Sequence, residues 1–234
     1  MIEKILPSWV VTAEEFGDVP DATLFPEEEE LIANAVAVRR GEFVTGRHCA
    51  RRALARLGVS PGPIPRGERG APLWPPGTIG SITHCAGYRA AAVAAERDAA
   101  TLGIDAEPHG PLPSGVLEAI ARPEEIVALR LLQNAEPGVC WDRILFSAKE
   151  SVYKAWFPVT GRWLEFSEAS VDIGTSGRFT ARLLVTDARM GTDLLAGRWL
   201  VADGLLATAI ARARQDVDPD GRRRPPQSGA GPLT

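Results

Sequence analysis

The strongest helical pattern of the chain lies at residues 141–157 and reads WDRILFSAKESVYKAWF. Its apolar residues recur at helical spacing and predict one buried face, formed by Leu145, Ala148, Val152 and Ala155/Trp156. We expect Pro158 to end this helix, because proline lacks the N–H that a further turn needs.

Strand patterns follow this helix at residues 165–173, 178–185, 197–201 and 205–211. Asp203-Gly204 predicts a two-residue hairpin turn between the last two strands. The same order occurs earlier, with a helix at 43–57 and strands at 80–84, 88–94 and 100–107. A long helix followed by antiparallel strands, twice over, indicates an α+β protein with two similar halves.

Other segments are less regular. Pro26 and the acids after it predict a helix to about Arg40 that Gly41 interrupts. Residues 67–70 predict a hairpin tip, and short helices are expected at 115–121 and 123–133. The last ~20 residues, with the basic triplet 222–224, have no periodicity and are expected to be disordered.

Composition limits the class of protein. The 234 residues hold 30 acidic and 26 basic side chains, and this net charge of −4 argues against a nucleic-acid-binding protein. No apolar run reaches the ~18 residues that a membrane helix needs, so no membrane partner is expected. The three cysteines form no paired motif, which favours reduced thiols and a cytoplasmic location.

Asp105 and Glu107 are the first candidate site residues, in the stretch GIDAE at 103–107. On a strand they share one face, where two carboxylates repel each other unless a cation lies between them. A hard divalent ion fits that need. The alternative is a strand end with two solvated acids.

Ser147, Glu150 and Lys154 share a second stripe of the 141–157 helix, away from the apolar one. Glu150 can serve as a third oxygen ligand, and Lys149 and Lys154 can meet phosphate oxygens, a set that suits Mg²⁺. The alternative is an ordinary surface ion pair between Glu150 and Lys154.

Thr83 and His84 end a strand in GSITHC at 80–85, where a hydroxyl, an imidazole and backbone N–H groups can meet an anion. Basic side chains precede this strand, at Arg39 or Arg40, Arg47, Arg51 and Arg66. They suit a phosphorylated ligand, although each can equally be a structural or solvated residue. The motifs GxGxxG, GxxxxGK[ST], GxSxG and HExxH are absent from the sequence.

Taken in order, these blocks resemble the Sfp-type 4′-phosphopantetheinyl transferases. The blocks are GAPLWP at 70–75, GSITHC at 80–85, GIDAE at 103–107 and FSAKESVYKAW at 146–156. The resemblance covers about residues 26–211 and is closest to the actinobacterial single-chain members.

This resemblance implies a pseudo-twofold α+β monomer, with an N-terminal half at 1–108, a C-terminal half at 109–212 and a tail at 213–234. It implies a Mg²⁺-dependent enzyme, with Mn²⁺ as a substitute, that transfers the 4′-phosphopantetheine arm of coenzyme A to a serine of an apo acyl or peptidyl carrier protein and releases 3′,5′-ADP. Whether the carriers serve fatty acid, polyketide or nonribosomal peptide synthesis, in primary or secondary metabolism, stays open.

By the same resemblance, Asp105, Glu107 and Glu150 would hold the metal ion, and Glu150 or a metal-bound water would take the proton of the carrier serine. Lys154, with Lys149 near it, would neutralise phosphate charge, while Thr83 and His84 would bind the 3′-phosphate, helped by Arg39, Arg47 and Arg66. Arg66 stands where many relatives carry lysine, and Ala106 stands where some carry a third ligand. Two other functions are kept open: a Mg²⁺-dependent hydrolase of nucleotide pyrophosphates, and a non-catalytic module that binds coenzyme A or a carrier protein.

Overall fold

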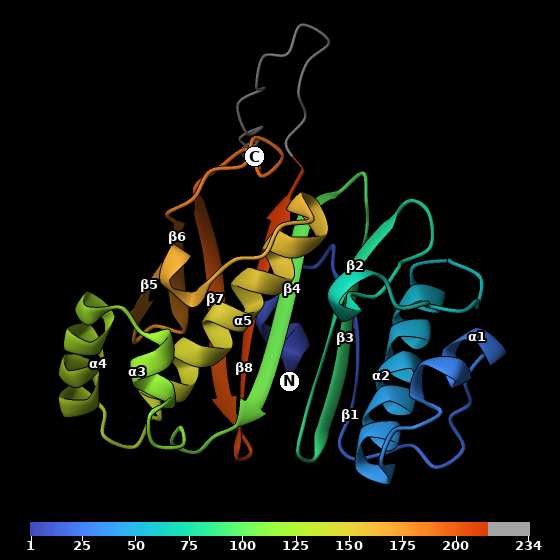
Figure 1. Cartoon of the computed structure of the whole chain (residues 1–234), viewed down its shortest axis with the longest axis horizontal. Coiled ribbons are helices and arrows are strands. Elements are labelled where there is room, and N and C mark those ends of the chain that lie inside the picture. Colours follow the sequence, from blue (N-terminus) through green and yellow to red (C-terminus); the bar gives the residue numbers. More distant parts are fainter. Residues whose placement is uncertain (215–234) are drawn as a thin grey trace, which may run out of the picture.

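A computed structural model describes residues 1–214 of the chain. Its smaller sheet is antiparallel, in the order β1-β3-β2, and consists of β1 (Val11–Glu15), β2 (Thr78–Cys85) and β3 (Tyr88–Ala95). The long helix α2 (Ala37–Arg56) packs on this sheet through small apolar side chains such as Cys49, Ala50 and Ala53 (Figure 1).

The larger sheet is also antiparallel, in the order β4-β8-β7-β6-β5. Its strands are β4 (Ala99–Pro108), β5 (Ala169–Gly174), β6 (Arg178–Leu183), β7 (Leu194–Ala202) and β8 (Leu205–Ala213). Helix α5 (Trp141–Thr160) covers one face of this sheet, and their joint core contains Trp141, Trp156 and Trp199 (Figure 1). The prediction of two halves, each a long helix on an antiparallel sheet, is confirmed.

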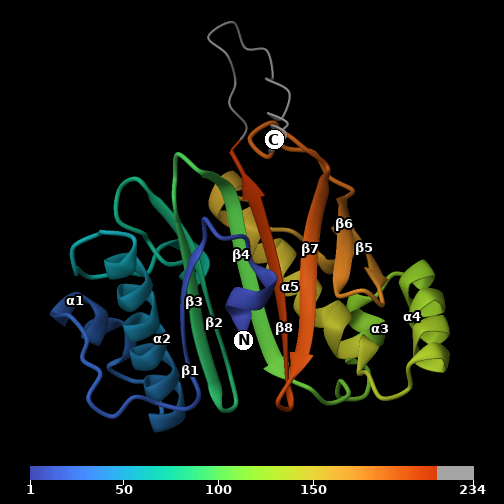
Figure 2. The same ribbon diagram turned by 180° about the vertical axis from the view of Figure 1, so that it is seen from behind.

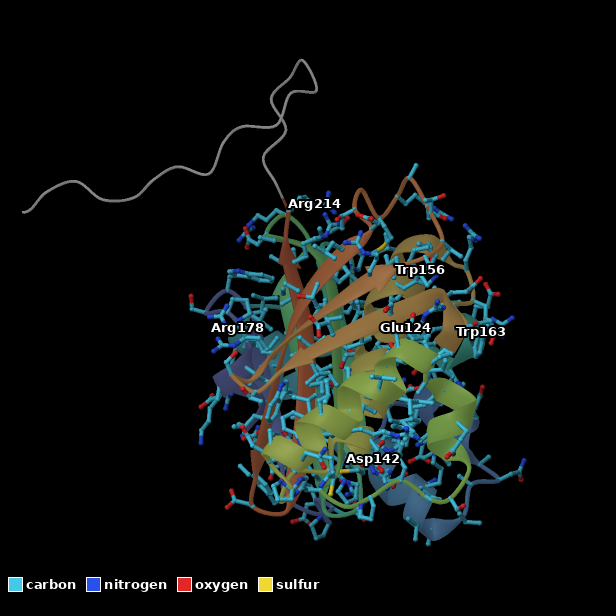
Figure 3. The ribbon with its side chains drawn as sticks, turned by 90° about the vertical axis from the view of Figure 1, so that its left-hand side faces the viewer. Glu124, Asp142, Trp156, Trp163, Arg178 and Arg214 are labelled. Atoms are coloured by element: carbon cyan, nitrogen blue, oxygen red, sulfur yellow. The ribbon has the colours of Figure 1, made fainter. Side chains whose placement is uncertain are left out.

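Shorter elements complete the molecule. The 3₁₀ helix at Ile2–Ile5 lies on the face of the larger sheet opposite to α5 (Figure 2). Helix α4 (Pro123–Ala135) covers α5 and the edge strand β5 (Figure 3). The others are α1 (Pro26–Glu29), α3 (Val116–Ile120) and 3₁₀ turns at Glu30–Ile32, Glu68–Gly70 and Phe166–Glu168. Among residues 1–214, no helix combines the length and the apolar composition needed to cross a bilayer.

The two halves meet where β2 lies beside β4. These strands are joined through hydroxyl groups: Ser81 Oγ accepts the N–H of Ile104 at 3.1 Å, and Thr83 Oγ1 accepts the N–H of Ala106 at 2.9 Å. Strand β4 itself pairs with β8 and so belongs to the larger sheet. The division at residue 108 stays a prediction, and residues 215–234 of the expected tail lie outside the described residues.

The predicted helix from Pro26 to Arg40 is wrong. Helix α1 ends at Glu29, a 3₁₀ turn follows, and α2 begins at Ala37 and runs without a break through Gly41. A Cβ atom at Gly41 would overlap the carboxylate of Asp18. This glycine therefore allows a close approach of the preceding segment and does not interrupt the helix.

The predicted end of α5 at Pro158 is also wrong, because the helix continues to Thr160. Pro158 cannot donate a backbone hydrogen bond, but two hydrogen bonds hold the last turn. Thr160 Oγ1 donates to the Trp156 carbonyl at 3.0 Å, and the N–H of Gly161 donates to the Phe157 carbonyl at 2.8 Å. Gly161, at φ 63°, then ends the helix in the left-handed conformation.

Candidate active site

Strand β4 and helix α5 carry the predicted acidic residues, and Gly103 lets the two elements come close. A Cβ atom at Gly103 would overlap the Ser151 carbonyl oxygen and crowd the amide of Ala155. Because only glycine fits at this crossing, the Asp105 and Glu107 side chains of β4 reach the polar face of α5. We call this contact the acid seam: Asp105, Glu107 and Glu150 with Arg143, Ser147 and Lys154.

Asp105 lies at the centre of the acid seam and is only 4% exposed. Its Oδ1 accepts a hydrogen bond from Lys154 Nζ at 2.7 Å and a longer one from Thr83 Oγ1 at 3.3 Å. Its Oδ2 accepts from Ser147 Oγ at 2.8 Å. A nearly buried carboxylate with three donors is a rigidly oriented group.

Glu107 and Glu150 flank Asp105. Burial, followed by the charge of Asp105, raises the pKa of Glu107 to about 7, although Arg143 Nη1 lies 3.2 Å from its Oε2. Burial also raises the pKa of Glu150, and the charge of Lys154 opposes that rise. The three acids therefore compete for too little positive charge.

Arg143 is a member of the seam that the sequence interpretation missed. Besides Glu107, it binds the carbonyl groups of Gly110 and Pro111, at 3.0 and 2.8 Å, and so ties the end of β4 to α5. A signal was present, because residues 143, 147, 150 and 154 continue one helical stripe by a further turn.

The acid seam offers three carboxylates, and carboxylate oxygens are the ligands that a hard divalent cation prefers. Within residues 1–214, however, no three acidic, histidine or cysteine side chains are placed so that they could hold one metal ion. Lys154 and Arg143 occupy the carboxylates instead. The donor types therefore fit a metal ion, whereas their arrangement in residues 1–214 does not bring three of them together on one point.

Lys149 is not brought to the acid seam. Its Nζ lies 2.9 Å from Glu125 Oε2 and donates to the carbonyl groups of Phe166 and Ala169. Burial lowers the pKa of Lys149, and Glu125 opposes this effect. Lys149 thus fastens α5 to α4 and to the start of β5.

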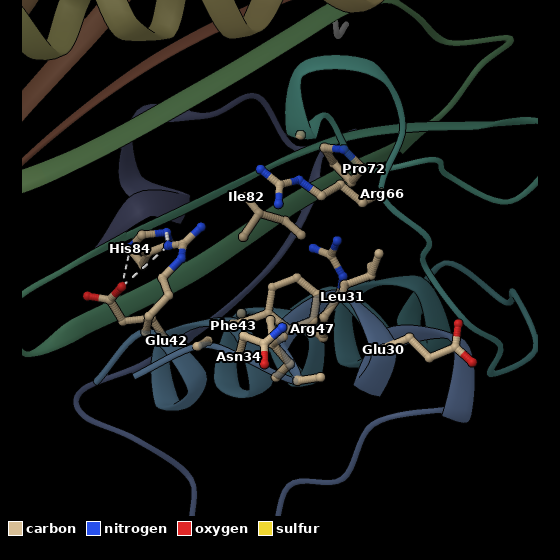
Figure 4. Close-up of a pocket in the computed structure, with 16 residues that line it drawn as sticks. Glu30, Leu31, Asn34, Glu42, Phe43, Arg47, Arg66, Pro72, Ile82 and His84 are labelled. Carbon is tan, nitrogen blue, oxygen red and sulfur yellow. Dashed lines mark hydrogen bonds and ion pairs between the residues drawn. The ribbon is translucent and has the colours of Figure 1, made fainter. Parts of the chain in front are cut away.

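Arg39, Arg47, Arg66 and His84 come together in one pocket of about 370 Å³ between α2, the end of β2 and the loop after Ile64, which we call the arginine pocket. Figure 4 shows Arg47 rising from α2 and Arg66 entering from the loop, with both guanidinium groups pointing into the same space. Three positive charges in one concave site favour an anionic ligand.

Fixed contacts orient the side chains of the arginine pocket. Arg47 Nε donates to the Ile64 carbonyl at 3.0 Å, and its guanidinium lies 4.4 Å from the centre of the Phe43 ring. Arg39 Nη1 donates to His84 Nε2 at 2.5 Å, so the proton of this imidazole is on Nδ1, which lies 3.3 Å from Glu42. Burial lowers the pKa of His84 and keeps the ring neutral at pH 7.

Glu28 supports this pocket from behind, and the sequence interpretation missed it. Its side chain is fully buried, accepts hydrogen bonds from Arg51 and from the N–H of Ile64, and lies 3.8 Å from Arg47 Nε. It thereby fixes the backbone just before Arg66. In the sequence it is one of four consecutive glutamates, so nothing local distinguishes it.

Two smaller pockets connect the arginine pocket with the acid seam. The junction pocket, about 190 Å³, shares Gly70, Pro72 and Ile82 with the arginine pocket and is also lined by Arg69, Glu150, Tyr153 and Lys154. The aromatic pocket, about 160 Å³, shares Glu150 and Tyr153 with the junction pocket and adds Trp163, Leu164 and Phe166. The junction pocket thus adjoins the arginine pocket on one side and the aromatic pocket on the other, and Glu150 lines the junction and aromatic pockets.

Comparison with known proteins agrees with this arrangement. A model of the 4′-phosphopantetheinyl transferase N-terminal domain matches residues 27–94, and a model of the 4′-phosphopantetheinyl transferase superfamily matches residues 101–202. The 4′-phosphopantetheinyl transferase Svp of Streptomyces mobaraensis is 52% identical, over 99% of this chain and 95% of its own.

Two further relatives are similar over nearly their whole length. The 4′-phosphopantetheinyl transferase PptT of Mycobacterium tuberculosis is 48% identical, over 90% of this chain and 97% of its own, and Npt of Nocardia iowensis is 50% identical, over 91% and 100%. The resemblance based on the motifs is confirmed. Of the transferase, the hydrolase and the binding module, the comparisons support the transferase. The chain belongs to the 4′-phosphopantetheinyl transferase superfamily and moves the 4′-phosphopantetheine group of coenzyme A to carrier proteins.

Proposed function

We propose that this transferase binds coenzyme A along the three connected pockets and transfers its arm at the acid seam. The observation that carries the proposal is the order of chemistry along the pockets: arginines first, then the acids with Lys154, then aromatic side chains. Coenzyme A has the same order, from its phosphorylated nucleotide through the diphosphate to the pantetheine arm.

The arginine pocket would take the 3′-phosphate through Arg39, Arg47, Arg66 and His84. Arg47 keeps its charge there, because burial lowers its pKa only to about 10. Thr83 has a different task in this proposal, since its buried hydroxyl already bonds to Asp105 and to the N–H of Ala106. Lys149, bound to Glu125, would likewise hold the fold and not the ligand.

Asp105, Glu107 and Glu150 would hold Mg²⁺, with Mn²⁺ as a substitute, after Lys154 and Arg143 release their carboxylates. The ion would supply charge neutralisation at the diphosphate, which is the main requirement of phosphoryl transfer. Lys154 Nζ, freed from Asp105, would remain near Glu150 in the junction pocket and could pair with phosphate oxygens.

Glu150 is the proposed base. As the hydroxyl of the carrier serine attacks the β-phosphorus, a new O–P bond forms and the bond to the ADP oxygen breaks, and the serine proton passes to the Glu150 carboxylate directly or through a water molecule. Burial raises the pKa of Glu150, which makes its carboxylate a better proton acceptor near neutral pH. The acceptors would be apo acyl and peptidyl carrier proteins.

The test combines transfer with metal binding. Purified apo carrier proteins of several biosynthetic types are incubated with coenzyme A, MgCl₂ and the protein, and the intact mass is measured. We expect a gain of one phosphopantetheine group that EDTA abolishes and that Mg²⁺ or Mn²⁺ restores.

Metal binding is measured separately, by titrating Mn²⁺ into the free protein and recording its electron paramagnetic resonance. The variant Glu107→Gln should weaken Mn²⁺ binding, while Glu118→Gln, on the short helix α3, should not. Transfer at the full rate in EDTA, or equal Mn²⁺ binding by both variants, would contradict the metal assignment.

A further inference from the structure

Arg69 has an unusual backbone conformation in the loop between the arginine pocket and β2. Its φ of 52° and ψ of 22° lie in the left-handed region, which non-glycine residues seldom occupy. Gly70 follows, also at positive φ, and packs under the guanidinium of Arg66. The loop thus holds Arg66 and Arg69 in fixed relation while their side chains enter different pockets.

The side chain of Arg69 crosses the cleft between the two halves. Its Cζ lies 5.0 Å from the centre of the Trp163 ring, which belongs to the segment after α5. Trp163 is 48% exposed and lies at the edge of the molecule, whereas Trp156 of α5 is buried (Figure 3). This is a cation–π contact at an exposed site, which is weaker than charged hydrogen bonds between a guanidinium and a phosphate.

The charge of Arg69 is not neutralised by an acid. No carboxylate of the described part of the chain lies within ion-pair distance of it, whereas Lys154, the other cation of the junction pocket, is bound to Asp105 at 2.7 Å. Among residues 1–214, the specific contact of this exposed guanidinium in the junction pocket is therefore with an aromatic ring and not with an acid.

Tyr153 offers a second unused group in the same place. Its hydroxyl is buried and has no hydrogen-bond partner among residues 1–214, and the residue lines both the junction and the aromatic pocket. Burial raises the pKa of Tyr153, and the charge of Arg69 opposes that rise, which shows that the two groups are close. A buried hydroxyl without a partner beside an unpaired cation is suited to a polar, anionic ligand.

We propose that Arg69 binds the β-phosphate of coenzyme A, the phosphate that is transferred, and that Trp163 holds the guanidinium across the cleft until the ligand arrives. This inference rests on the proposed placement of the diphosphate in the junction pocket. The β-phosphate is the one joined to the pantetheine arm, and Arg69 reaches toward the aromatic pocket that would take the arm. The competing explanation is that Arg69 and Trp163 merely fasten the two loops together.

Two ligands distinguish these explanations. Coenzyme A carries the β-phosphate and the arm, whereas 3′,5′-ADP carries only the nucleotide and its other phosphates. Calorimetric titrations with both ligands, in MgCl₂, are made on the wild type, Arg69→Gln, Arg69→Gly and Arg66→Gln. Glycine accepts the left-handed conformation freely, so Arg69→Gly removes the side chain without straining the loop.

We expect both Arg69 variants to bind coenzyme A about 10- to 100-fold more weakly and 3′,5′-ADP within twofold of the wild type. The control variant Arg66→Gln should weaken the binding of both ligands, because Arg66 lines the arginine pocket. Unchanged affinity for coenzyme A in Arg69→Gly, or an equal loss for both ligands, would overturn the inference. If the wild type binds coenzyme A no more tightly than 3′,5′-ADP, the β-phosphate and the arm add no affinity. That result would overturn the placement of the diphosphate in the junction pocket, and this inference with it.

Discussion

The arginine pocket and the acid seam both gather like charges, but they neutralise them to different extents. In the arginine pocket the nearest carboxylates are distant, with Glu28 3.8 Å from Arg47 and Glu42 3.4 Å from Arg39, and among residues 1–214 none lies within ion-pair distance of Arg66. In the acid seam, by contrast, Lys154 binds Asp105 and Arg143 binds Glu107. The first site is prepared for an anion, while the second must exchange side-chain partners before it accepts a cation.

Burial explains this difference, because it acts on groups whose ordinary pKa values lie at different distances from neutrality. It lowers the pKa of Arg47 to about 10, so the guanidinium stays charged at pH 7. It raises the pKa of Glu107 to about 7, so the carboxylate is only partly ionised at the same pH. The buried Arg47 can therefore stay charged although its nearest carboxylate, Glu28, lies 3.8 Å away, whereas the buried acids of the seam need close internal cations.

The largest effect should come from removing the centre of the acid seam. We expect Asp105→Asn to slow transfer by at least about 10³-fold, because the variant loses the charge that faces Lys154 and the proposed metal ion. The rate is followed by the intact mass of the carrier protein, and circular dichroism checks the fold. The control is Asp172→Asn, at an exposed position of β5. A rate within tenfold of the wild type would place the chemistry elsewhere.

The next effect is on stability and concerns the support of the arginine pocket. Glu28→Gln breaks the pair between the fully buried Glu28 carboxylate and Arg51, whose side chain is 14% exposed, and removing one partner of a buried pair costs about 3–5 kcal/mol. The free energy of unfolding is measured with urea. Glu29→Gln is the matched control, because the exposed pair of Glu29 with Arg40 contributes only about 0.2–1 kcal/mol. Equal losses in the two variants would mean that Glu28 is not a specific support.

A smaller effect should appear in ligand affinity. Arg39→Gln removes one charged contact from the arginine pocket, which predicts about 10- to 100-fold weaker binding of coenzyme A. Dephospho-coenzyme A lacks the 3′-phosphate and should bind this variant within about threefold of the wild type. The neighbouring Arg40→Gln serves as the control, because Arg40 pairs with Glu29 and does not line the pocket. A similar loss for both ligands would assign Arg39 to another part of coenzyme A.

Sequence patterns predicted the elements that repeat locally and missed features set by distant partners. The long helices and the positions of strands along the chain followed from apolar periodicity, and the Asp203-Gly204 turn was placed correctly, with both residues at positive φ. Periodicity did not show that β4, expected with the first group of strands, pairs with β8 in the larger sheet. Gly41 was misread because the Asp18 that it accommodates lies far back in the chain.

The candidate site shows the same division. Residues of one helical stripe, such as Glu150 and Lys154, could be grouped from their spacing. Lys149 could not be placed, because its partner Glu125 comes from another helix. Glu125 is itself buried and accepts N–H groups from Arg122 and Val171, so it needs a nearby cation, and only the tertiary structure shows which lysine supplies it.

The smallest effect concerns the pH dependence of stability and tests whether His84 in the arginine pocket stays neutral at pH 7. Burial lowers the pKa of His84; Arg39, Lys154 and Arg89 lower it further, and Glu42 opposes them. Below pH ~6.5 the imidazole is therefore protonated in the unfolded chain and still neutral in the folded chain. Because the unfolded chain binds more protons, the free energy of unfolding falls as the pH decreases. The free energy of unfolding of the wild type should decline more steeply from pH 7 to 5 than that of His84→Asn, by at most about 1.4 kcal/mol per pH unit, the limit for one proton.

Nuclear magnetic resonance of the imidazole gives the direct check: 3′,5′-ADP should raise the pKa of His84, because its 3′-phosphate adds negative charge to the pocket, while dephospho-coenzyme A should leave it nearly unchanged. An imidazole that titrates above 6.5 in the free protein, or that responds equally to both ligands, would show that the pocket neither excludes the proton nor receives the 3′-phosphate at His84.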